Sequence, residues 1–262
     1  MKKTVRSLLY LLGILLILGG ILLALVPKLT HLQYTIQVKT QYLDFLRQQE
    51  PPQVSPDRPE ASPETQPPLT DLDRLYQLMA EKNQALYENH QPGLSGPSAY
   101  ASPEIDPAQY GLSDGVVAYL TIPRMDITLP VLLGANGPNM TQGAGHLTHT
   151  SYPIGGENTN CVLAAHRGYA RTAMFRDIEG LQPGDPVYLQ NFRQLLAYRV
   201  SEIQVISPDQ VEAIYIQPGR DLLTLLTCHP LHHNYQRYLV FCSRDIALEQ
   251  AAAADPAFPS LP

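Results

Sequence analysis

Residues 221–244 read DLLTLLTCHPLHHNYQRYLVFCSR, two apolar runs joined by a polar loop that contains one proline. Apolar runs of this length, bounded by turn-forming residues, predict a pair of adjacent strands. The first run ends at Cys228, and Arg237 stands nine positions later, directly before the second run. Upstream, the run CVLAAHRG ends in His166. If the three strands are neighbours, a thiol, an imidazole and a guanidinium meet at one edge of a sheet.

These three side chains suit acyl transfer through a thioester. A cysteine attacks as its thiolate, and nearby positive charge lowers its pKa from about 8.5. His166 can act as general base and then protonate a leaving amine. Arg237 stays protonated, so its useful role is to hold a carbonyl and stabilise an oxyanion. The alternative is that the three residues are structural, and a papain-like site is disfavoured because there the cysteine precedes the histidine.

An uncharged apolar run occupies residues 8–26. At about 1.5 Å per residue, it nearly spans a hydrocarbon core of about 30 Å. The basic residues Lys2, Lys3 and Arg6 precede it, which predicts a cytoplasmic N-terminus over residues 1–7 and an extracellular domain beyond the membrane. A cleaved signal peptide is the alternative, but its apolar region is shorter and ends in small residues. We therefore expect a single-pass signal-anchor in the cell membrane.

Residues 27–109 are expected to form an extracellular helical region. A proline-rich linker at 51–68 divides it, since seven of those eighteen residues are proline. A loop rich in Gly, Pro and Ser follows at 91–107. The net charge of −6 gives no reason to expect nucleic acid as a partner.

From residue 110 to residue 246, short β-branched or apolar runs alternate with turn signals. About eight such runs predict a mainly β domain, either a barrel or a sandwich. One or two helical turns are expected around residues 172–181, before Pro183 and Gly184. The last segment, residues 247–262, is small and proline-rich and is expected to be a flexible tail.

The remaining cysteines and histidines offer a rival interpretation. Cys161 and Cys242 lie inside apolar runs, so we expect small buried hydrophobic side chains there in preference to a disulfide between them. The candidate metal ligands are Cys228, His229, His232, His233, His146 and His149, but their spacing matches no zinc template, so no metal is expected. We instead expect His229, His232 and His233 to be exposed loop residues near the cleft. His146 and His149 are expected at solvated loop positions.

The combined motifs resemble those of the sortase family. TLLTCHPLHHNYQR resembles the sortase active-site strand and loop, TLxTCxPxxxNxxR, and GGENTNCVLAAHRG resembles the histidine strand. AYLTIPRMDITLPVLLG resembles the opening strands and FRDIEGLQPGD an internal helix and turn, so the resemblance covers about residues 115–244. The positions that match the active-site motif are Thr224, Leu225, Thr227, Cys228, Pro230, Asn234 and Arg237.

The resemblance implies an eight-stranded sortase-type barrel with short helices, preceded by N-terminal helices and one transmembrane helix. It implies that Cys228 is the acyl-thioester nucleophile, His166 the proton donor and acceptor, and Arg237 the transition-state stabiliser. Thr227, Pro230 and Asn234 would then bind substrate or support the loop. No cofactor is implied.

The implied reaction is transpeptidation. A Leu-Pro-x-Thr-Gly-like (LPXTG-like) sorting signal on a surface protein or pilin is cut between Thr and Gly, and the acyl group passes to an amine. The long N-terminal helical region looks most like class C, the pilin-polymerising sortases, which implies a pilin lysine as acceptor. The alternatives are a sortase that anchors surface proteins to cell-wall peptide, and a non-catalytic surface module that binds peptides.

Two features depart from the class C pattern. Class C sortases usually cover the cysteine with a lid anchored by Asp-Pro-aromatic, but Gly96, Pro97 and Ser98 stand where that anchor falls. An Asp-Pro pair occurs at Asp106–Pro107, followed by Ala108. A second membrane helix is common at the class C C-terminus, whereas AAAADPAFPSLP cannot span a bilayer. Both departures bear on pilus polymerisation rather than on the chemistry at Cys228.

Overall fold

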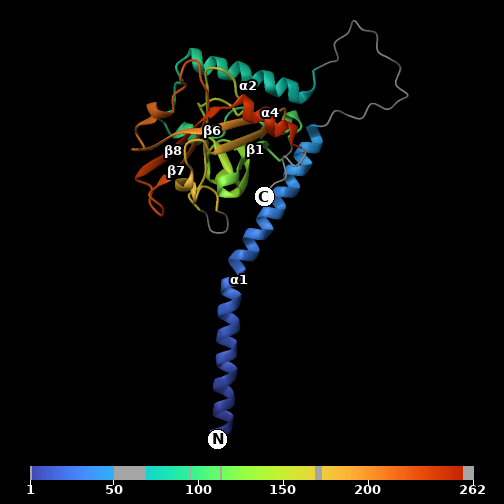
Figure 1. Cartoon of the computed structure of the whole chain (residues 1–262), viewed down its shortest axis with the longest axis vertical. Helices are drawn as coiled ribbons and strands as arrows, with labels where there is room; N and C mark the ends of the chain where they lie inside the picture. The colour runs from blue at the N-terminus through green and yellow to red at the C-terminus, as the bar shows by residue number, and fades with distance from the viewer. Residues whose placement is uncertain (1, 50–68, 95, 113, 169–172, 256–262) are drawn as a thin grey trace, which may run out of the picture.

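The computed structural model describes residues 2–49, 69–94, 96–112, 114–168 and 173–255. Figure 1 shows a long helix that leads from the N-terminus to a rounded body built from β-strands. The proline-rich linker at 51–68 and the last residues, 256–262, lie outside the described part.

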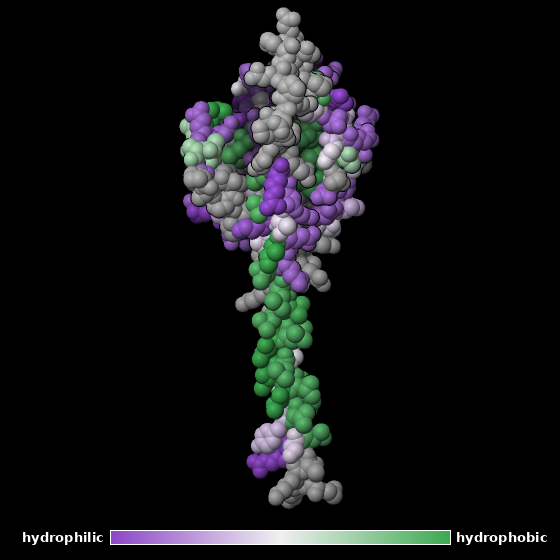
Figure 2. Space-filling view, turned by 90° about the vertical axis from the view of Figure 1, so that its right-hand side faces the viewer, coloured by the Kyte–Doolittle hydropathy of each residue, from purple (hydrophilic) through white to green (hydrophobic). Residues whose placement is uncertain are grey.

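The N-terminal helix α1 (Lys2–Gln49) is one continuous element of 48 residues. Its segment Arg6–Leu23 is long and apolar enough to cross a membrane, with a mean hydropathy of 2.2 and no part buried against the body. Figure 2 shows this segment as an apolar stem that projects from a largely polar body. The distal end of α1 packs on the barrel, where Tyr42 and Phe45 contact Tyr119 edge-on at ring-centroid distances of 4.9 and 5.2 Å.

Helix α2 (Asp71–Glu88) begins with a capping box. The Asp73 amide donates to Thr70 Oγ1 at 3.1 Å, and the Thr70 amide donates to Asp73 Oδ2 at 3.1 Å. These bonds satisfy backbone donors that a helix start leaves free. Leu75 and Met79 of α2 are buried in the main core. The helix is therefore part of the folded body and not a detached spacer.

Eight strands form a closed barrel, which confirms the predicted fold class. Around the barrel their order is β1-β2-β3-β4-β7-β8-β6-β5. The β2–β3 and β4–β7 pairs are parallel, and the other pairs are antiparallel. The strands are β1 (Val116–Ile122), β2 (Ile127–Leu133), β3 (Ala144–His146), β4 (Thr159–Ala164), β5 (Pro186–Asn191), β6 (Leu195–Ile206), β7 (Asp221–His229) and β8 (Gln236–Arg244).

Short helices connect and cover the strands. They are η1 (Pro97–Tyr100), η2 (Pro107–Tyr110), η3 (Pro123–Met125), α3 (Gly137–Gln142), η4 (Ile178–Gly180), η5 (Val211–Ile214) and α4 (Ile246–Ala254). The expectation of a flexible tail from residue 247 is wrong for its first part, which forms α4. Asp245 caps this helix by accepting from the Leu248 amide at 2.9 Å, and the alanine-rich sequence has high helix propensity.

Alternate side chains of the central strands face two different cores. Leu163, Leu225 and Val240 point into the barrel and belong to the main core. Their neighbours on the same strands point outward and form a second apolar cluster, which we call the outer cluster. It contains Leu94, Ala99, Ala135, Leu147, Val162, Ala164, Ile214, Leu226, Leu239 and Phe241. This two-residue alternation decides on which face of the barrel each strand-end side chain lies.

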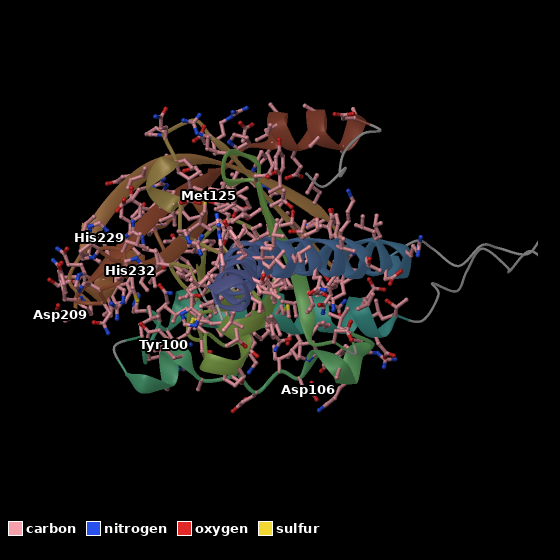
Figure 3. The ribbon with its side chains drawn as sticks, turned by 90° about the horizontal axis from the view of Figure 1, so that it is seen from below. Tyr100, Asp106, Met125, Asp209, His229 and His232 are labelled. Carbon is pink, nitrogen blue, oxygen red and sulfur yellow. The ribbon has the colours of Figure 1, made fainter. Side chains whose placement is uncertain are left out.

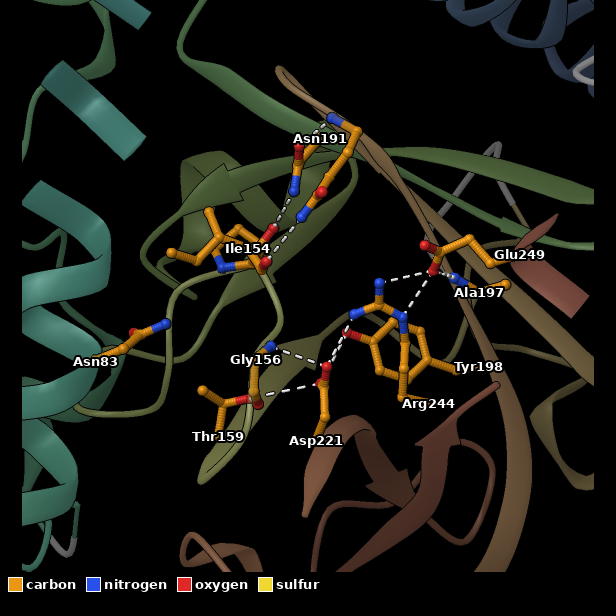
Figure 4. Close-up of polar contacts among 12 residues, drawn as sticks. Asn83, Ile154, Gly156, Thr159, Asn191, Ala197, Tyr198, Asp221, Arg244 and Glu249 are labelled. Carbon is orange, nitrogen blue, oxygen red and sulfur yellow. Dashed lines mark hydrogen bonds and ion pairs between the residues drawn. The ribbon is translucent and has the colours of Figure 1, made fainter. Parts of the chain in front are cut away.

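A half-buried polar network fixes the start of β7 and the end of β8 (Figure 4). The Asp221 carboxylate accepts from Arg244 Nη1 at 2.8 Å, from the Gly156 amide at 2.8 Å and from Tyr198 Oη at 3.1 Å. Arg244 Nε also donates to Glu249 of α4 at 2.7 Å. Burial raises the pKa of Tyr198 well above its ordinary value, so the phenol stays protonated and donates. The network joins β6, β7, β8 and α4 at the end of the strands away from Cys228.

Candidate active site

The strand register brings the three predicted catalytic residues to the same level. In the parallel β4–β7 pair, Ala164 lies opposite Leu226, and the Ala165 amide donates to the Leu226 carbonyl at 3.2 Å. Two residues further along each chain, His166 follows β4 and comes level with Cys228. In the antiparallel β7–β8 pair, Cys228 lies directly opposite Arg237. Imidazole, thiol and guanidinium therefore stand on three neighbouring strand ends in the order β4, β7, β8.

All three side chains belong to the outer face of the barrel. Ala164 and Leu226 lie in the outer cluster, and side chains two residues apart on a strand share a face. His166 and Cys228 consequently extend the outer cluster at its polar end. Arg237 does the same on β8, two residues before Leu239. The site is thus a continuation of an apolar surface, where burial can exclude water from a reacting carbonyl.

Burial differs sharply among the three cysteines, all of which are free. Cys161 and Cys242 are buried inside the barrel, as predicted, and burial raises the pKa of both thiols. Thiols with a raised pKa are poor nucleophiles because the thiolate is the reactive form. Cys228 is only partly buried, so it is the thiol that a substrate can reach.

The partly buried His166 favours its neutral form. Desolvation lowers the pKa of its imidazole, because burial penalises the charged state. A neutral imidazole can accept a proton, which a general base requires. The Phe175 amide donates to the His166 carbonyl at 3.1 Å, so the following segment holds the backbone of this residue.

The loop between β7 and β8 holds Arg237 with backbone oxygens. Arg237 Nη1 donates to the carbonyls of Asn234, at 2.8 Å, and Gln236, at 3.0 Å. Asn234 thus contributes its backbone carbonyl to the guanidinium. The Pro230 carbonyl accepts from the His233 amide at 2.9 Å within the loop, and the His229–Pro230 peptide bond is cis.

Thr227 ties together the two strand ends that carry His166 and Cys228. Its hydroxyl donates to the Ala165 carbonyl at 2.7 Å, and the residue is only 1% exposed. The bond joins the residue before Cys228 to the residue before His166. Thr227 therefore lies where it can hold the distance between the two strand ends and does not contact solvent.

Sequence reasoning missed two charged residues beside the site, Arg167 and Glu179. The Arg167 side chain is 5% exposed and its Nη2 lies 2.5 Å from Glu179 Oε1. The expectation that His229 is an exposed loop residue is wrong. It ends β7, and its Nδ1 lies 2.8 Å from Arg167 Nη1 and 3.1 Å from Glu179 Oε1. The only sequence signal was a cation placed directly after the His166 strand.

The expectation of a solvated loop position is also wrong for His146. This residue ends β3 and is 1% exposed, and its Nε2 lies 3.2 and 3.1 Å from the carbonyls of Thr150 and Ser151. Burial lowers its pKa to about 4. His149 does lie in a loop, and His232 and His233 are exposed. In the described part of the chain, no three His, Cys, Asp or Glu side chains gather as metal ligands.

The segment that contains Gly96, Pro97 and Ser98 lies over the outer cluster. Leu94 and Ala99 on either side of it are 4% and 1% exposed and pack within that cluster. The Thr148 amide donates to the Ala99 carbonyl at 2.8 Å, and Gln91 Nε2 donates to the His149 carbonyl at 3.3 Å. The segment is thus fastened to the barrel beside the strand ends that carry the site.

The Asp106–Pro107 pair serves its own turn. The Asp106 side chain caps η2 by accepting from the Ala108 amide at 3.1 Å, and Pro107 is buried. Figure 3 shows Asp106 well away from His232 and from His229, which directly follows Cys228 at the end of β7. The pair therefore does not anchor a cover over the cysteine.

An accessible cysteine level with a histidine and opposite an arginine, on a closed eight-stranded barrel, is an arrangement suited to acyl transfer through a thioester. The sortase domain family model matches residues 120–245. Sortase C1 of GBS Pilus Island 1 is 32% identical, with a TM-score of 0.61 over 67% of this chain and 89% of that one. Sortase C from Clostridium perfringens SM101 is 34% identical, with a TM-score of 0.55 over 67% and 89%. The chain belongs to the sortase family, whose members are cysteine transpeptidases.

Curated relatives carry other sortase names. Sortase A of Streptococcus agalactiae serotype III (strain NEM316) is 32% identical over 117 residues, which are 43% of this chain and 47% of that protein. Sortase A of Bacillus anthracis is 28% identical over 156 residues, 59% of this chain and 72% of that protein. The chain thus spans about half of the first relative, while its structural neighbours include class C sortases.

Proposed function

We propose that this protein is a membrane-anchored transpeptidase that cleaves an LPXTG-like sorting signal and transfers the acyl group to an amine. The observation that carries the proposal is the level placement of His166, Cys228 and Arg237 on three neighbouring strand ends, on one face of the barrel. The apolar segment of α1 supplies the single-pass anchor, with residues 1–7 on the cytoplasmic side and the barrel outside the cell.

In the acylation step, His166 first takes the proton of the Cys228 thiol, and Sγ then attacks the carbonyl carbon of the threonine in the signal. The carbonyl π electrons move to oxygen, and Arg237 stabilises the oxyanion with charge-assisted hydrogen bonds. His166 delivers a proton to the glycine nitrogen as the C–N bond breaks, so the leaving peptide departs as a neutral amine. The product is a thioester on Cys228.

In the transfer step, an acceptor amine attacks the thioester carbonyl. His166 removes a proton from that amine, the tetrahedral intermediate collapses, and Cys228 leaves as a thiolate that takes this proton back from His166. The pKa of His166, lowered by desolvation, keeps the imidazole ready to accept this proton near neutral pH. The same two side chains thus serve both half-reactions in opposite directions.

The segment around Gly96, Pro97 and Ser98 is proposed to regulate access to the outer face. Leu94 and Ala99 occupy apolar surface next to Ala164 and Leu226, the residues that precede His166 and Cys228 by two positions. An apolar side chain of a sorting signal that docks beside Cys228 competes for this surface. We call this segment the cover. It lacks an Asp-Pro-aromatic anchor, so apolar packing and backbone hydrogen bonds hold it on the barrel.

A pilin lysine is the proposed acceptor, because the structural neighbours include Sortase C1 of GBS Pilus Island 1. A cell-wall peptide amine is the second candidate, since the Gly96-Pro97-Ser98 segment departs from the class C lid. The two acceptors differ only in the second half-reaction. Supplying both amines to the acyl-enzyme therefore decides between them.

The test is mass spectrometry of the full chain in detergent micelles with a sorting-signal peptide and each candidate amine. Wild type should gain the mass of the acyl fragment and then form product with one amine. Cys228→Ala should form no acyl-enzyme, whereas the matched variants Cys161→Ala and Cys242→Ala should retain it. An acyl-enzyme on Cys228→Ala would refute the assignment of the nucleophile. If folded wild type never forms an acyl-enzyme, the remaining interpretation is a non-catalytic surface module that binds peptides.

A further inference from the structure

We infer that Arg167 is a positioning residue that clamps the two strand ends carrying His166 and Cys228. The inference rests on the proposed function, because it assigns Arg167 a role only if those two residues carry the chemistry. Arg167 directly follows His166, and its guanidinium reaches across to the residues at the end of β7. Glu179, on η4, is the anion that holds the guanidinium in this position.

The contacts of Arg167 cross from β4 to β7. Nη1 lies 3.4 Å from the Cys228 carbonyl oxygen and 2.8 Å from His229 Nδ1, and both atoms accept from it. Nη2 binds Glu179 Oε1 at 2.5 Å. The guanidinium also lies 5.8 Å from the ring centroid of Tyr238 on β8. One side chain therefore contacts the backbone of the nucleophile, its neighbour, and the adjoining strand.

The network lies on the opposite face of the strands from the reacting groups. Tyr238 points into the barrel, and His229 shares this face because it lies two residues beyond Thr227, the partner of Tyr238. Arg167 and these two rings therefore close the interior of the barrel beneath the site. The guanidinium does not reach the outer face, where His166 and Cys228 stand, so its effect on the reaction is through their backbones.

Glu179 and the backbone of its segment complete the clamp. Ile178, the residue before Glu179, is fully buried and anchors η4 in the main core. The same segment donates the Phe175 amide to the His166 carbonyl at 3.1 Å. The hydrogen bond from Arg167, reinforced by its charge, lowers the pKa of Glu179, so the carboxylate is charged at neutral pH. The segment 173–180 thus binds both the backbone carbonyl of His166 and the guanidinium of Arg167.

A buried guanidinium in this place has a geometric consequence. Its planar fork can donate to Glu179 and to the end of β7 at the same time, which a single-point cation cannot do. If Arg167 is removed, the Thr227–Ala165 hydrogen bond is the one of these two side-chain contacts that still holds the ends of β4 and β7 at a fixed distance. A misplacement of about 1 Å between reacting groups can cost about 100-fold in rate. Arg167→Gln is therefore expected to slow acylation about 10- to 100-fold.

The experiment is a double-mutant cycle on the full chain in detergent micelles with the sorting-signal peptide. The cycle uses Arg167→Gln, Glu179→Gln and the double variant. The control cycle uses Arg199→Gln and Asp245→Asn, another 2.5 Å ion pair, which joins β6 to the cap of α4. Quenched-flow mass spectrometry gives kcat and KM for acylation, and circular dichroism gives the folded fraction at the assay temperature.

Loss of kcat with little change in KM is expected for the Arg167 cycle, with non-additive effects and a fully folded protein. Arg167→Lys should restore part of the rate because it keeps the charge, and Glu179→Gln provides a milder variant because its side chain is half-exposed. Both control variants should acylate like wild type. If folded Arg167→Gln acylates with the kcat of wild type, the inference is overturned and the proposed function stands. The same holds if the loss of activity equals the fraction of protein that is unfolded. Absence of acylation in wild type defeats the proposed function and this inference with it.

Discussion

Replacing Asp221 should weaken the fold while leaving the chemistry unchanged. Asp221 begins β7 and Cys228 lies seven residues along the same strand, about 23 Å away at about 3.3 Å per residue. Its carboxylate is 14% exposed and accepts from Arg244, Tyr198 and the Gly156 amide. The substitution Asp221→Ala removes the acceptor and leaves the Arg244 guanidinium partly buried with only Glu249 as a counterion.

The cost follows from the burial of the partners. Breaking one side of a buried, hydrogen-bonded ion pair costs about 3–5 kcal/mol, and the partial exposure of this pair places the estimate at about 3 kcal/mol. For a domain of this size, that corresponds to a fall in Tm of about 6–12 °C. Asp221→Asn keeps an acceptor oxygen but loses the charge, so about 1–2 kcal/mol is expected.

Circular dichroism in the tyrosine band can follow unfolding, since the chain has 15 tyrosines and no tryptophan. Acylation should then be measured at a temperature where both variants and wild type are fully folded. There the rate with the sorting peptide should equal that of wild type. The reasoning fails if Asp221→Ala lowers the free energy of unfolding by less than about 1 kcal/mol relative to wild type. It also fails if the folded variant acylates slowly.

Three further changes have expected outcomes. Arg237→Lys should lower the acylation rate about 10²- to 10³-fold with little change in KM, measured by stopped-time mass spectrometry, because an ammonium replaces a planar fork at the oxyanion; unaltered turnover would remove Arg237 from the mechanism. Leu94→Ala should weaken the cover by about 2 kcal/mol and raise the peptide acylation rate by up to about 30-fold, and an unchanged rate would mean that the segment does not compete with substrate. His146 has a pKa of about 4 in the fold against an ordinary 6.5, so the unfolded chain binds the proton more readily and stability should fall by up to about 3 kcal/mol between pH 6.5 and pH 4. In urea unfolding across that pH range, the stability of His146→Gln should depend less on pH than that of wild type. An identical pH dependence would contradict the role of His146.

The strands could be predicted because their side chains alternate or run apolar between turn signals. The choice between barrel and sandwich could not be made from the residues, since it depends on pairs far apart in sequence. The β4–β7 pair is parallel and joins residues about sixty positions apart, and no local pattern specifies such a partner. The resemblance supplied the closed barrel. The error over α4 was avoidable, because Asp245 before IALEQAAAA is a visible N-cap followed by strong helix formers.

The errors within the site have a common physical origin. His146 follows Gly and Ala in a strand of three residues, too short for alternation to be recognised. Arg167 was overlooked because burial of a cation depends on its partner, and Glu179 lies twelve positions later on a separate short helix. His229 was misplaced because β7 continues past Cys228 into what reads as a polar loop. In each case a tertiary contact overrides the local composition.

For the proposed reaction, register at the strand ends that carry His166 and Cys228 is a stricter requirement than stability of the barrel as a whole. A slip of one residue between β4 and β7 would turn Cys228 into the barrel and bring Thr227 to the outer face, since neighbouring side chains alternate. The Thr227–Ala165 bond opposes that slip from within the sheet, and Arg167 opposes it from beneath. The Asp221 network, by contrast, holds the far end of the same strand. Loss of Asp221 should therefore change how much protein is folded, while loss of Arg167 should change how fast each folded molecule reacts.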